Sequence, residues 1–147
     1  MRLSRESRYA IEALSALATR PPGELVEARE LAAEADLPAP FLSKIMRRLA
    51  SGGVISSVRG RGYRLDREAT IVSLSEILAA VEGNDVIWET CIFWREECEP
   101  QNPCPLHFQW AEIKPGLQSV MGSITLADIR DNGLAEAARH SSRRDPD

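Results

Sequence analysis

Three cysteines and a histidine lie close together in the second half of the chain: Cys91, Cys98, Cys104 and His107. His107 follows Cys104 by three positions, so the two side chains would share one face of a helix that begins at Cys104 and Pro105. Thiolates and imidazoles are ligands that zinc and iron–sulfur clusters take in proteins. The residue types and their spacing therefore predict a metal centre built from this one segment.

On the residues alone, four interpretations of this segment stay open. An iron–sulfur cluster (2Fe-2S or 4Fe-4S) takes mainly thiolate ligands and accepts a different fourth one. A structural zinc would be held by three cysteines and one histidine, although zinc fingers usually pair their cysteines more closely. A thiol switch needs an electropositive setting, which Glu96, Glu97 and Glu99 oppose beside Cys98. The fourth interpretation, three small core residues, fits poorly with a polar segment that prolines interrupt.

The charged residues divide the chain into two parts of opposite sign. Residues 1–67 hold 12 Lys and Arg against 8 Asp and Glu, a net charge of +4, whereas residues 68–147 hold 6 against 14, a net charge of −8. Together they give the −4 of the whole chain, which by itself argues weakly against a nucleic-acid partner. The uneven distribution instead indicates that the first part alone faces a polyanion.

The apolar spacing of the basic part predicts three helices followed by a β-hairpin. The helices are expected over residues 3–19, 26–35 and 39–51. Two short extended runs between Val54 and Leu65 flank a tip rich in glycine and arginine, as in a β-hairpin. Helices and a hairpin in this order are typical of a winged helix-turn-helix, so we assign residues 1–67 to a DNA-binding head of mainly α structure.

Five side chains of this head are candidate DNA contacts. The second helix of a helix-turn-helix pair enters the major groove, which would bring Ser43, Lys44 and Arg47 to base edges or phosphates. Arg59 and Arg61 lie at the hairpin tip, from which arginines can reach a narrow minor groove of negative potential. A helical bundle with a merely solvated charged face is the alternative, and the arginine-bearing hairpin argues against it.

The acidic part is expected to connect the head to an oligomerisation element. A short helix over Leu74–Val81, capped by Ser73, and the cysteine segment would fill residues 68–107. The region of residues 104–132 then carries an apolar stripe at helical spacing. Its members are Trp110, Ile113, Leu117, Val120, Met121 and Ile124. Because this stripe lies far along the chain from the first core, we expect a long helix that pairs with a second copy in a homodimer.

Two features limit this dimerisation helix. Pro115-Gly116 lies within the periodic stretch and predicts a kink or a break there. Residues 133–147 are rich in Ala, Ser, Arg and Asp and predict a disordered tail.

Composition argues against several other classes of protein. No apolar run is long enough to cross a bilayer, so no membrane association is expected. The first residues lack the apolar core of a secretory signal, and an odd number of cysteines does not suit a disulfide scaffold, so a cytoplasmic location is expected. An enzyme is not expected, because the sequence offers no nucleophile–base pair. The remaining alternative is a metal or iron–sulfur trafficking protein without DNA binding. The arginine-bearing hairpin, which would form the wing, argues against this alternative.

Short motifs along residues 1–133 resemble one group of bacterial regulators. They are Met1-Arg2-Leu3-Ser4, Phe41-Leu42, Arg48-Leu49, Ser57-Val58-Arg59-Gly60, Gly62-Tyr63, Ala80-Val81-Glu82-Gly83, Leu106-His107 and Ile124-Thr125-Leu126-Ala127-Asp128. With the cysteine triplet, they are similar to the IscR, NsrR and RirA family of iron–sulfur transcriptional regulators. The hairpin tip is two residues shorter than the family's usual one.

The resemblance implies a homodimer with paired C-terminal helices and an iron–sulfur cluster on the three cysteines. It implies that redox change, nitric oxide or loss of iron at the cluster alters promoter binding. The fourth ligand in the family is a weaker one. The resemblance implies that the fourth ligand here is either His107 or an acid on the partner's first helix, Glu12 or Glu6. By themselves, both acids are expected to be ordinary solvated side chains.

Overall fold

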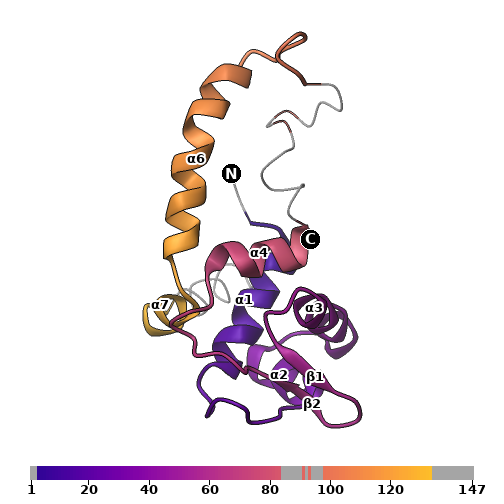
Figure 1. Ribbon diagram of the computed structural model, residues 1–147. Coiled ribbons are helices and arrows are strands. Elements are labelled where there is room, and N and C mark those ends of the chain that lie inside the picture. Colours follow the sequence, from indigo (N-terminus) through magenta and orange to yellow (C-terminus); the bar gives the residue numbers. More distant parts are fainter. Residues whose placement is uncertain (1–2, 84–90, 92, 94–97, 134–147) are drawn as a thin grey trace.

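The structure, a computed structural model, describes residues 3–83, 91, 93 and 98–133 (Figure 1). Its elements in chain order are α1 (Arg5–Leu17), α2 (Ala28–Ala35), α3 (Ala39–Ser51), β1 (Ser56–Val58), β2 (Gly62–Arg64), α4 (Leu74–Glu82), α6 (His107–Ser123) and α7 (Leu126–Asp131). The expected fold class, mainly helical with one small antiparallel hairpin, is confirmed. Glu96, Glu97 and the predicted tail beyond Gly133 lie outside the described residues.

The core lies where α1, α2 and α3 meet, and α4 and α7 complete it. Leu14 of α1 and Leu42 of α3 belong to one buried cluster with Ile77 of α4 and Leu126 of α7. Residues on both sides of position 67 therefore share one core. The helix α6 rises away from this core in Figure 1.

A tight turn joins α2 to α3. The helix α2 ends at Asp36, whose φ of 56° is left-handed, a conformation that Asp tolerates better than most residues. The Leu37 amide donates to the Ala32 carbonyl at 2.8 Å. The rings of Tyr9 and Phe41 meet edge to face with centroids 5.5 Å apart, and this contact fixes α3 against α1.

The hairpin, or wing, is attached to the chain just before α2. Val26 and Tyr63 exchange two backbone hydrogen bonds of 2.8 Å each. Because Val26 extends beside β2, the second helix begins at Ala28 and not at the predicted residue 26. A tight turn over residues 58–61 joins β1 to β2, with the Arg61 amide donating to the Val58 carbonyl at 2.9 Å.

The start of α4 and the end of α6 meet at one junction. Ser73 caps α4 as predicted, in a capping box with Glu76, and Thr125 caps α7. Three backbone hydrogen bonds of 2.8 to 3.0 Å join residues 69–74 to residues 124–127. The C-terminal end of α6 is therefore fixed to the head beside the first turn of α4.

Replacing Glu76 by glutamine is expected to make stability less sensitive to acid. Burial alone would raise the pKa of Glu76, but hydrogen bonds with Ser73 and the neighbouring Arg67 outweigh it and hold that pKa below its usual range. A carboxyl with a depressed folded pKa stabilises the fold above its unfolded pKa and loses this contribution as the pH falls through the folded pKa. Urea unfolding at a series of falling pH values measures the effect. Equal acid slopes in the two proteins would contradict it.

The bounds of α6 correct the predicted dimerisation helix. It begins at His107 and not at Cys104, and it ends at Ser123, so the region of residues 104–132 holds two helices. A kink or a break was predicted at Pro115, and the helix continues through this residue without a break. The proline removes the partner of the Ala111 carbonyl. Both residues are exposed, so water can satisfy that carbonyl and the helix continues.

The predicted apolar stripe divides into three sets. The half-buried members within α6 are Trp110, Leu117 and Met121. Ile124 lies in the cap after the helix and packs against the core of the head. Ile113 and Val120 are 59% and 55% exposed, so the described part of the chain leaves them uncovered. No helix within the described ranges combines the length and apolarity needed to cross a bilayer.

Candidate metal centre and nucleic-acid interface

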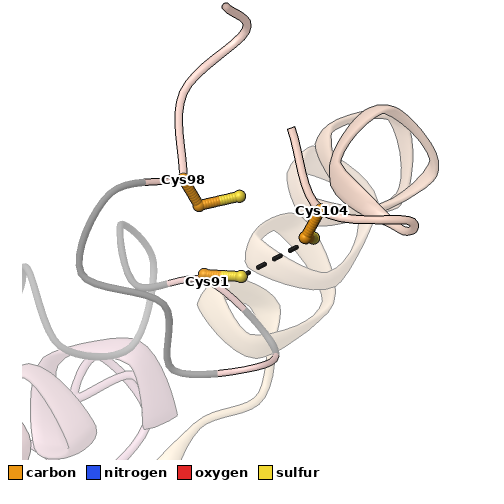
Figure 2. A group of neighbouring side chains, drawn as sticks. All are labelled: Cys91, Cys98 and Cys104. Carbon is orange, nitrogen blue, oxygen red and sulfur yellow. Dashed lines mark hydrogen bonds between the residues drawn. The ribbon is translucent and has the colours of Figure 1, made fainter. Parts of the chain in front are cut away.

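The three cysteines converge beside the N-terminal end of α6, the end that points away from the wing (Figures 1 and 2). The Sγ atoms of Cys91, Cys98 and Cys104 all lie within 4.8 Å of one another. The Cys91 thiol lies 3.6 Å from Cys104 Sγ, and the Phe93 amide donates to Cys91 Sγ at 3.4 Å. None of the three forms a disulfide. Their side chains point toward a common centre, as the sequence predicts.

His107 approaches the same centre from the first residue of α6. The helix was predicted to start at Cys104, but it starts at His107. The His107 amide donates to the Cys104 carbonyl at 3.1 Å, and this turn brings the two residues together. The Nδ1 atom of His107 lies 3.2 Å from Cys98 Sγ. One imidazole nitrogen therefore borders the sulfur atoms.

The separations between the sulfur atoms suit ligands of a shared metal centre. Sulfur ligands of a tetrahedral zinc, at about 2.3 Å from the metal, lie about 3.8 Å apart. The 3.6 Å between Cys91 and Cys104 is close to that value. Three thiols with an adjacent imidazole also match the mixed Cys and His ligand sets of iron–sulfur centres. The donor set therefore fits both kinds of group.

The pKa of the Cys98 thiol lies above its usual value. A hydrogen bond with the backbone of Cys104 lowers it, but burial and the thiols of Cys91 and Cys104 outweigh that effect. A raised pKa leaves little reactive thiolate in the absence of a neighbouring cation. Cys98 is therefore poorly suited to act as a thiolate switch.

The two acids considered as fourth ligands lie in different settings on α1. Glu12 is only 4% exposed, so the expectation of a solvated side chain is wrong, and its carboxylate is not presented at the surface. Glu6 is half-buried and accepts a hydrogen bond from Arg48 Nη1 at 2.5 Å, with Lys44 Nζ 4.0 Å away. Glu6 is therefore engaged by cations of α3 within its own chain.

The predicted contacts on α3 are presented unevenly. Lys44 and Arg47 are exposed. Ser43 is half-buried, and its hydroxyl donates to the Ala39 carbonyl at 3.0 Å. The hydroxyl proton of Ser43 is thus used within the helix, and only its oxygen lone pairs remain for a partner.

Arg59 and Arg61 are exposed at the tip of the wing, which lies near α3 at the lower right of Figure 1. Among the described residues, neither of them nor Arg47 forms an ion pair with an acid. Arg64, by contrast, pairs with Asp66 at 2.7 Å. Three positive side chains that pair with no acid of the described ranges therefore remain available for an anionic partner.

A polar junction between α1, α3 and α4 was not predicted from the sequence. Arg48 Nη1 donates to the Val81 carbonyl at 3.3 Å as well as to Glu6, and the Ser7 hydroxyl donates to Glu82 at 2.6 Å. These contacts join residues 33 to 75 positions apart. No local periodicity signals such pairs, and only the Arg48-Leu49 motif marked this part of α3.

Two relatives match most of the chain. A protein of Aquifex aeolicus (strain VF5) named "Putative HTH-type transcriptional regulator" is 32% identical over 126 residues, 83% of this chain and 86% of the relative. The HTH-type transcriptional regulator IscR of Yersinia pseudotuberculosis serotype O:1b (strain IP 31758) is 27% identical over 150 aligned positions, 98% of this chain and 90% of the relative.

Two solved structures share the fold. CymR, described as the global cysteine regulator of B. subtilis, matches with a TM-score of 0.70 and 23% identity, covering 90% of this chain and 98% of that one. IscR of T. potens matches with a TM-score of 0.66 and 24% identity, covering 90% and 88%. The predicted winged helix-turn-helix fold is confirmed.

Residues 3–132 match the sequence profile of the family Rrf2, described as "Iron-dependent Transcriptional regulator". The match includes the wing, all three cysteines and His107. It confirms the family resemblance predicted from the sequence motifs. The chain belongs to the Rrf2 family of transcriptional regulators.

Proposed function

We propose that this protein regulates transcription as a DNA-binding homodimer whose promoter affinity depends on an iron–sulfur cluster held by Cys91, Cys98, Cys104 and His107. The observation that carries the proposal is the convergence of three Sγ atoms within 4.8 Å on a chain that also bears an arginine wing. The family's description as iron-dependent and the names of the IscR relatives support it. The signal would be redox change, nitric oxide, or iron and cluster supply.

On the DNA side, α3 enters the major groove and the wing follows the adjacent minor groove. Lys44 and Arg47 reach guanine edges or phosphates, and Ser43 accepts a hydrogen bond from a base. Arg59 and Arg61 contact the minor groove or its phosphates, because negative potential there attracts arginine.

The second subunit pairs along α6. Ile113 and Val120 are exposed and seven positions apart, with Leu117 between them, which is the spacing of a coiled-coil seam. The 17 residues of α6 give a helix about 25 Å long for this contact. A dimer of this kind presents two wings to half-sites about one helical turn apart.

On the metal side, Cys104 is 5% exposed and is the best shielded of the cysteines. His107 supplies the fourth ligand from its own chain, because Nδ1 is already 3.2 Å from Cys98 Sγ. An iron–sulfur cluster bound here would supply a group that oxidants, nitric oxide or iron shortage can alter.

The first test is a visible absorption spectrum of protein purified without oxygen, with iron, sulfide and zinc assayed on the same sample. Equal amounts of iron and sulfide in a coloured protein are expected. A colourless protein that holds one zinc per chain and takes up no iron and sulfide would overturn the cluster and favour a structural zinc.

Replacing Arg61 by alanine is expected to weaken DNA binding and reduce its salt dependence. Affinity for DNA falls with salt in proportion to the phosphate charges neutralised, so losing one contact lowers the slope of log K against log salt by about 1. The measurement is fluorescence anisotropy with a duplex that the wild-type protein selects from a random pool. Lys114→Gln, on α6, is the control and is expected to leave the slope unchanged.

Two outcomes of the same titration would contradict the DNA-binding role. If the wild-type protein selects no duplex and binds no DNA at low salt, the chain is better explained as a metal or iron–sulfur trafficking protein. If it binds but Arg61→Ala and Lys114→Gln show the same salt slope, the wing does not contact phosphate.

A further inference from the structure

The C-terminal end of α4 is held at two points by polar contacts with the head. Arg48 of α3 donates to the Val81 carbonyl at 3.3 Å and to Glu6 at 2.5 Å. On the other side, Glu82 accepts hydrogen bonds from Ser7 and from Ser4, the N-cap of α1. Both contacts suit the polarity of the helix ends, since carbonyls near a C-terminus attract cations and an N-terminus attracts acids.

Close packing adds a steric contact between α3 and the same part of α4. Gly52, the C-cap of α3, lies against Ala80, and a Cβ built on Gly52 would lie 2.5 Å from Ala80 Cβ. The interface between α3 and the last turn of α4 therefore has no room for a further methyl group. A displacement of this turn would be transmitted to α3 rather than absorbed in a gap.

The chain leads from this turn directly into the cysteine segment. Cys91 follows Gly83 by eight positions, which limits their separation to about 29 Å. The other end of α4 is fixed to α6 by backbone hydrogen bonds such as that from Leu74 to Ile124, 2.8 Å long. The last turn of α4 is thus the part of the head nearest in sequence to the metal ligands.

We propose that Arg48 is a positioning residue that couples the DNA-reading helix α3 to the cysteine segment through the C-terminal end of α4. This inference rests on the proposed function, because it needs a metal centre that influences DNA binding. The Nη1 atom of a guanidinium carries two hydrogens, so this one nitrogen of Arg48 donates to Glu6 and to the Val81 carbonyl at the same time. The contact with Val81 joins α3 directly to α4. The contact with Glu6 joins α3 to α1, which holds Glu82 of α4 through Ser7.

The test compares DNA affinity with and without the metal centre in three proteins: wild type, Arg48→Gln and Arg47→Gln. Couplings between two sites change affinity by roughly 5- to 150-fold. Arg47 lies next to Arg48 but forms no hydrogen bond or ion pair with α4 among the described residues, so Arg47→Gln is expected to weaken both states by the same factor. In Arg48→Gln, the ratio of the DNA affinity with the metal centre to the DNA affinity without it is expected to lie at least about threefold closer to one than in wild type. An unchanged ratio in Arg48→Gln would overturn the proposal.

A second readout needs neither metal nor DNA. In the metal-free protein, backbone amides in the last turn of α4 are expected to exchange hydrogen faster in Arg48→Gln than in wild type or Arg47→Gln, since Arg48 no longer ties the Val81 carbonyl. If Arg48→Gln fails to fold, Glu82→Gln takes its place, because it weakens the contact of the same turn with α1. Faster hydrogen exchange in the last turn of α4 is expected for this variant too. Unchanged exchange in the folded variant rules the coupling out.

The two proposals fail in different ways. If wild-type affinity does not depend on the metal centre, the proposed function is wrong, and Arg48 then has no coupling to transmit. If wild type shows the dependence and Arg48→Gln keeps it in full, only the role of Arg48 is wrong.

Discussion

A chain in which Cys104 is replaced by serine is expected to lose iron and sulfide almost completely while its head stays folded. Cys104 is 5% exposed, and its sulfur lies 3.6 Å from that of Cys91. A serine hydroxyl is a hard and normally protonated group, which soft metal centres bind poorly compared with a thiolate. The side chain is not part of the hydrophobic cluster that joins α1, α3, α4 and α7, so stability of the metal-free head should change little.

The measurement is iron and sulfide per chain after anaerobic reconstitution, with urea unfolding of the metal-free protein on the same samples. Gln101→Ser is the matched control, because it introduces the same side chain at an exposed position of the same segment. It is expected to bind like wild type. Full iron binding by Cys104→Ser would show that Cys104 is not a ligand.

The convergence of the three cysteines and His107 could be predicted from the sequence because these candidate ligands are rare residue types close together in the chain. Three cysteines and a histidine between positions 91 and 107 leave few alternatives, and a short segment can close on itself without help from distant elements. The kind of metal could not be predicted in the same way. Thiol and imidazole ligands suit both zinc and iron–sulfur centres, so the types of ligand do not distinguish between them.

The helices of the head could be predicted where an apolar periodicity and a cap agree. The range of α3, residues 39–51, is the predicted one, and Ser73 caps α4 as expected. The prediction failed where a tertiary contact or exposure to solvent decides the structure. Val26 pairs with Tyr63 instead of starting α2, and α6 continues through Pro115 because solvent can satisfy the freed carbonyl. Neither the Val26–Tyr63 pairing nor the access of solvent to that carbonyl leaves a local signal in the sequence.

The buried acid and the polar junction were missed for a related reason. Glu12 is buried in the head, although a glutamate on an amphipathic helix is expected to face solvent. Arg48 finds Glu6 and Val81 across distances of 42 and 33 positions. Side chains on three helices meet there because the core brings those helices together. The apolar pattern thus predicts which helices pack together, while the polar contacts between them follow from the packing.

Replacing Gly62 by alanine is expected to detach the wing from the head and abolish specific DNA binding. Gly62 has a φ of +107°, which side-chain-bearing residues rarely adopt. A Cβ at this position would also lie 2.6 Å from the Val26 carbonyl carbon and 2.9 Å from the Glu27 amide nitrogen. Those atoms belong to the backbone that anchors β2 through the Val26–Tyr63 hydrogen bonds.

Two costs therefore add at Gly62, whereas only one applies at Gly60. A strained backbone conformation costs about 1–3 kcal/mol, and overpacking against an immobile backbone costs about 1–3 kcal/mol more. Gly60 also has a positive φ, +74°, but a Cβ there has no atom within 4 Å, so Gly60→Ala isolates the first cost.

Urea unfolding should place Gly62→Ala below Gly60→Ala in stability, and fluorescence anisotropy should show that Gly62→Ala no longer binds the selected duplex. Iron binding should persist, because the cysteines lie at the far end of α6 from the wing (Figure 1). If Gly62→Ala matches Gly60→Ala in stability and DNA affinity, the bridge to Val26 does not hold the wing in place.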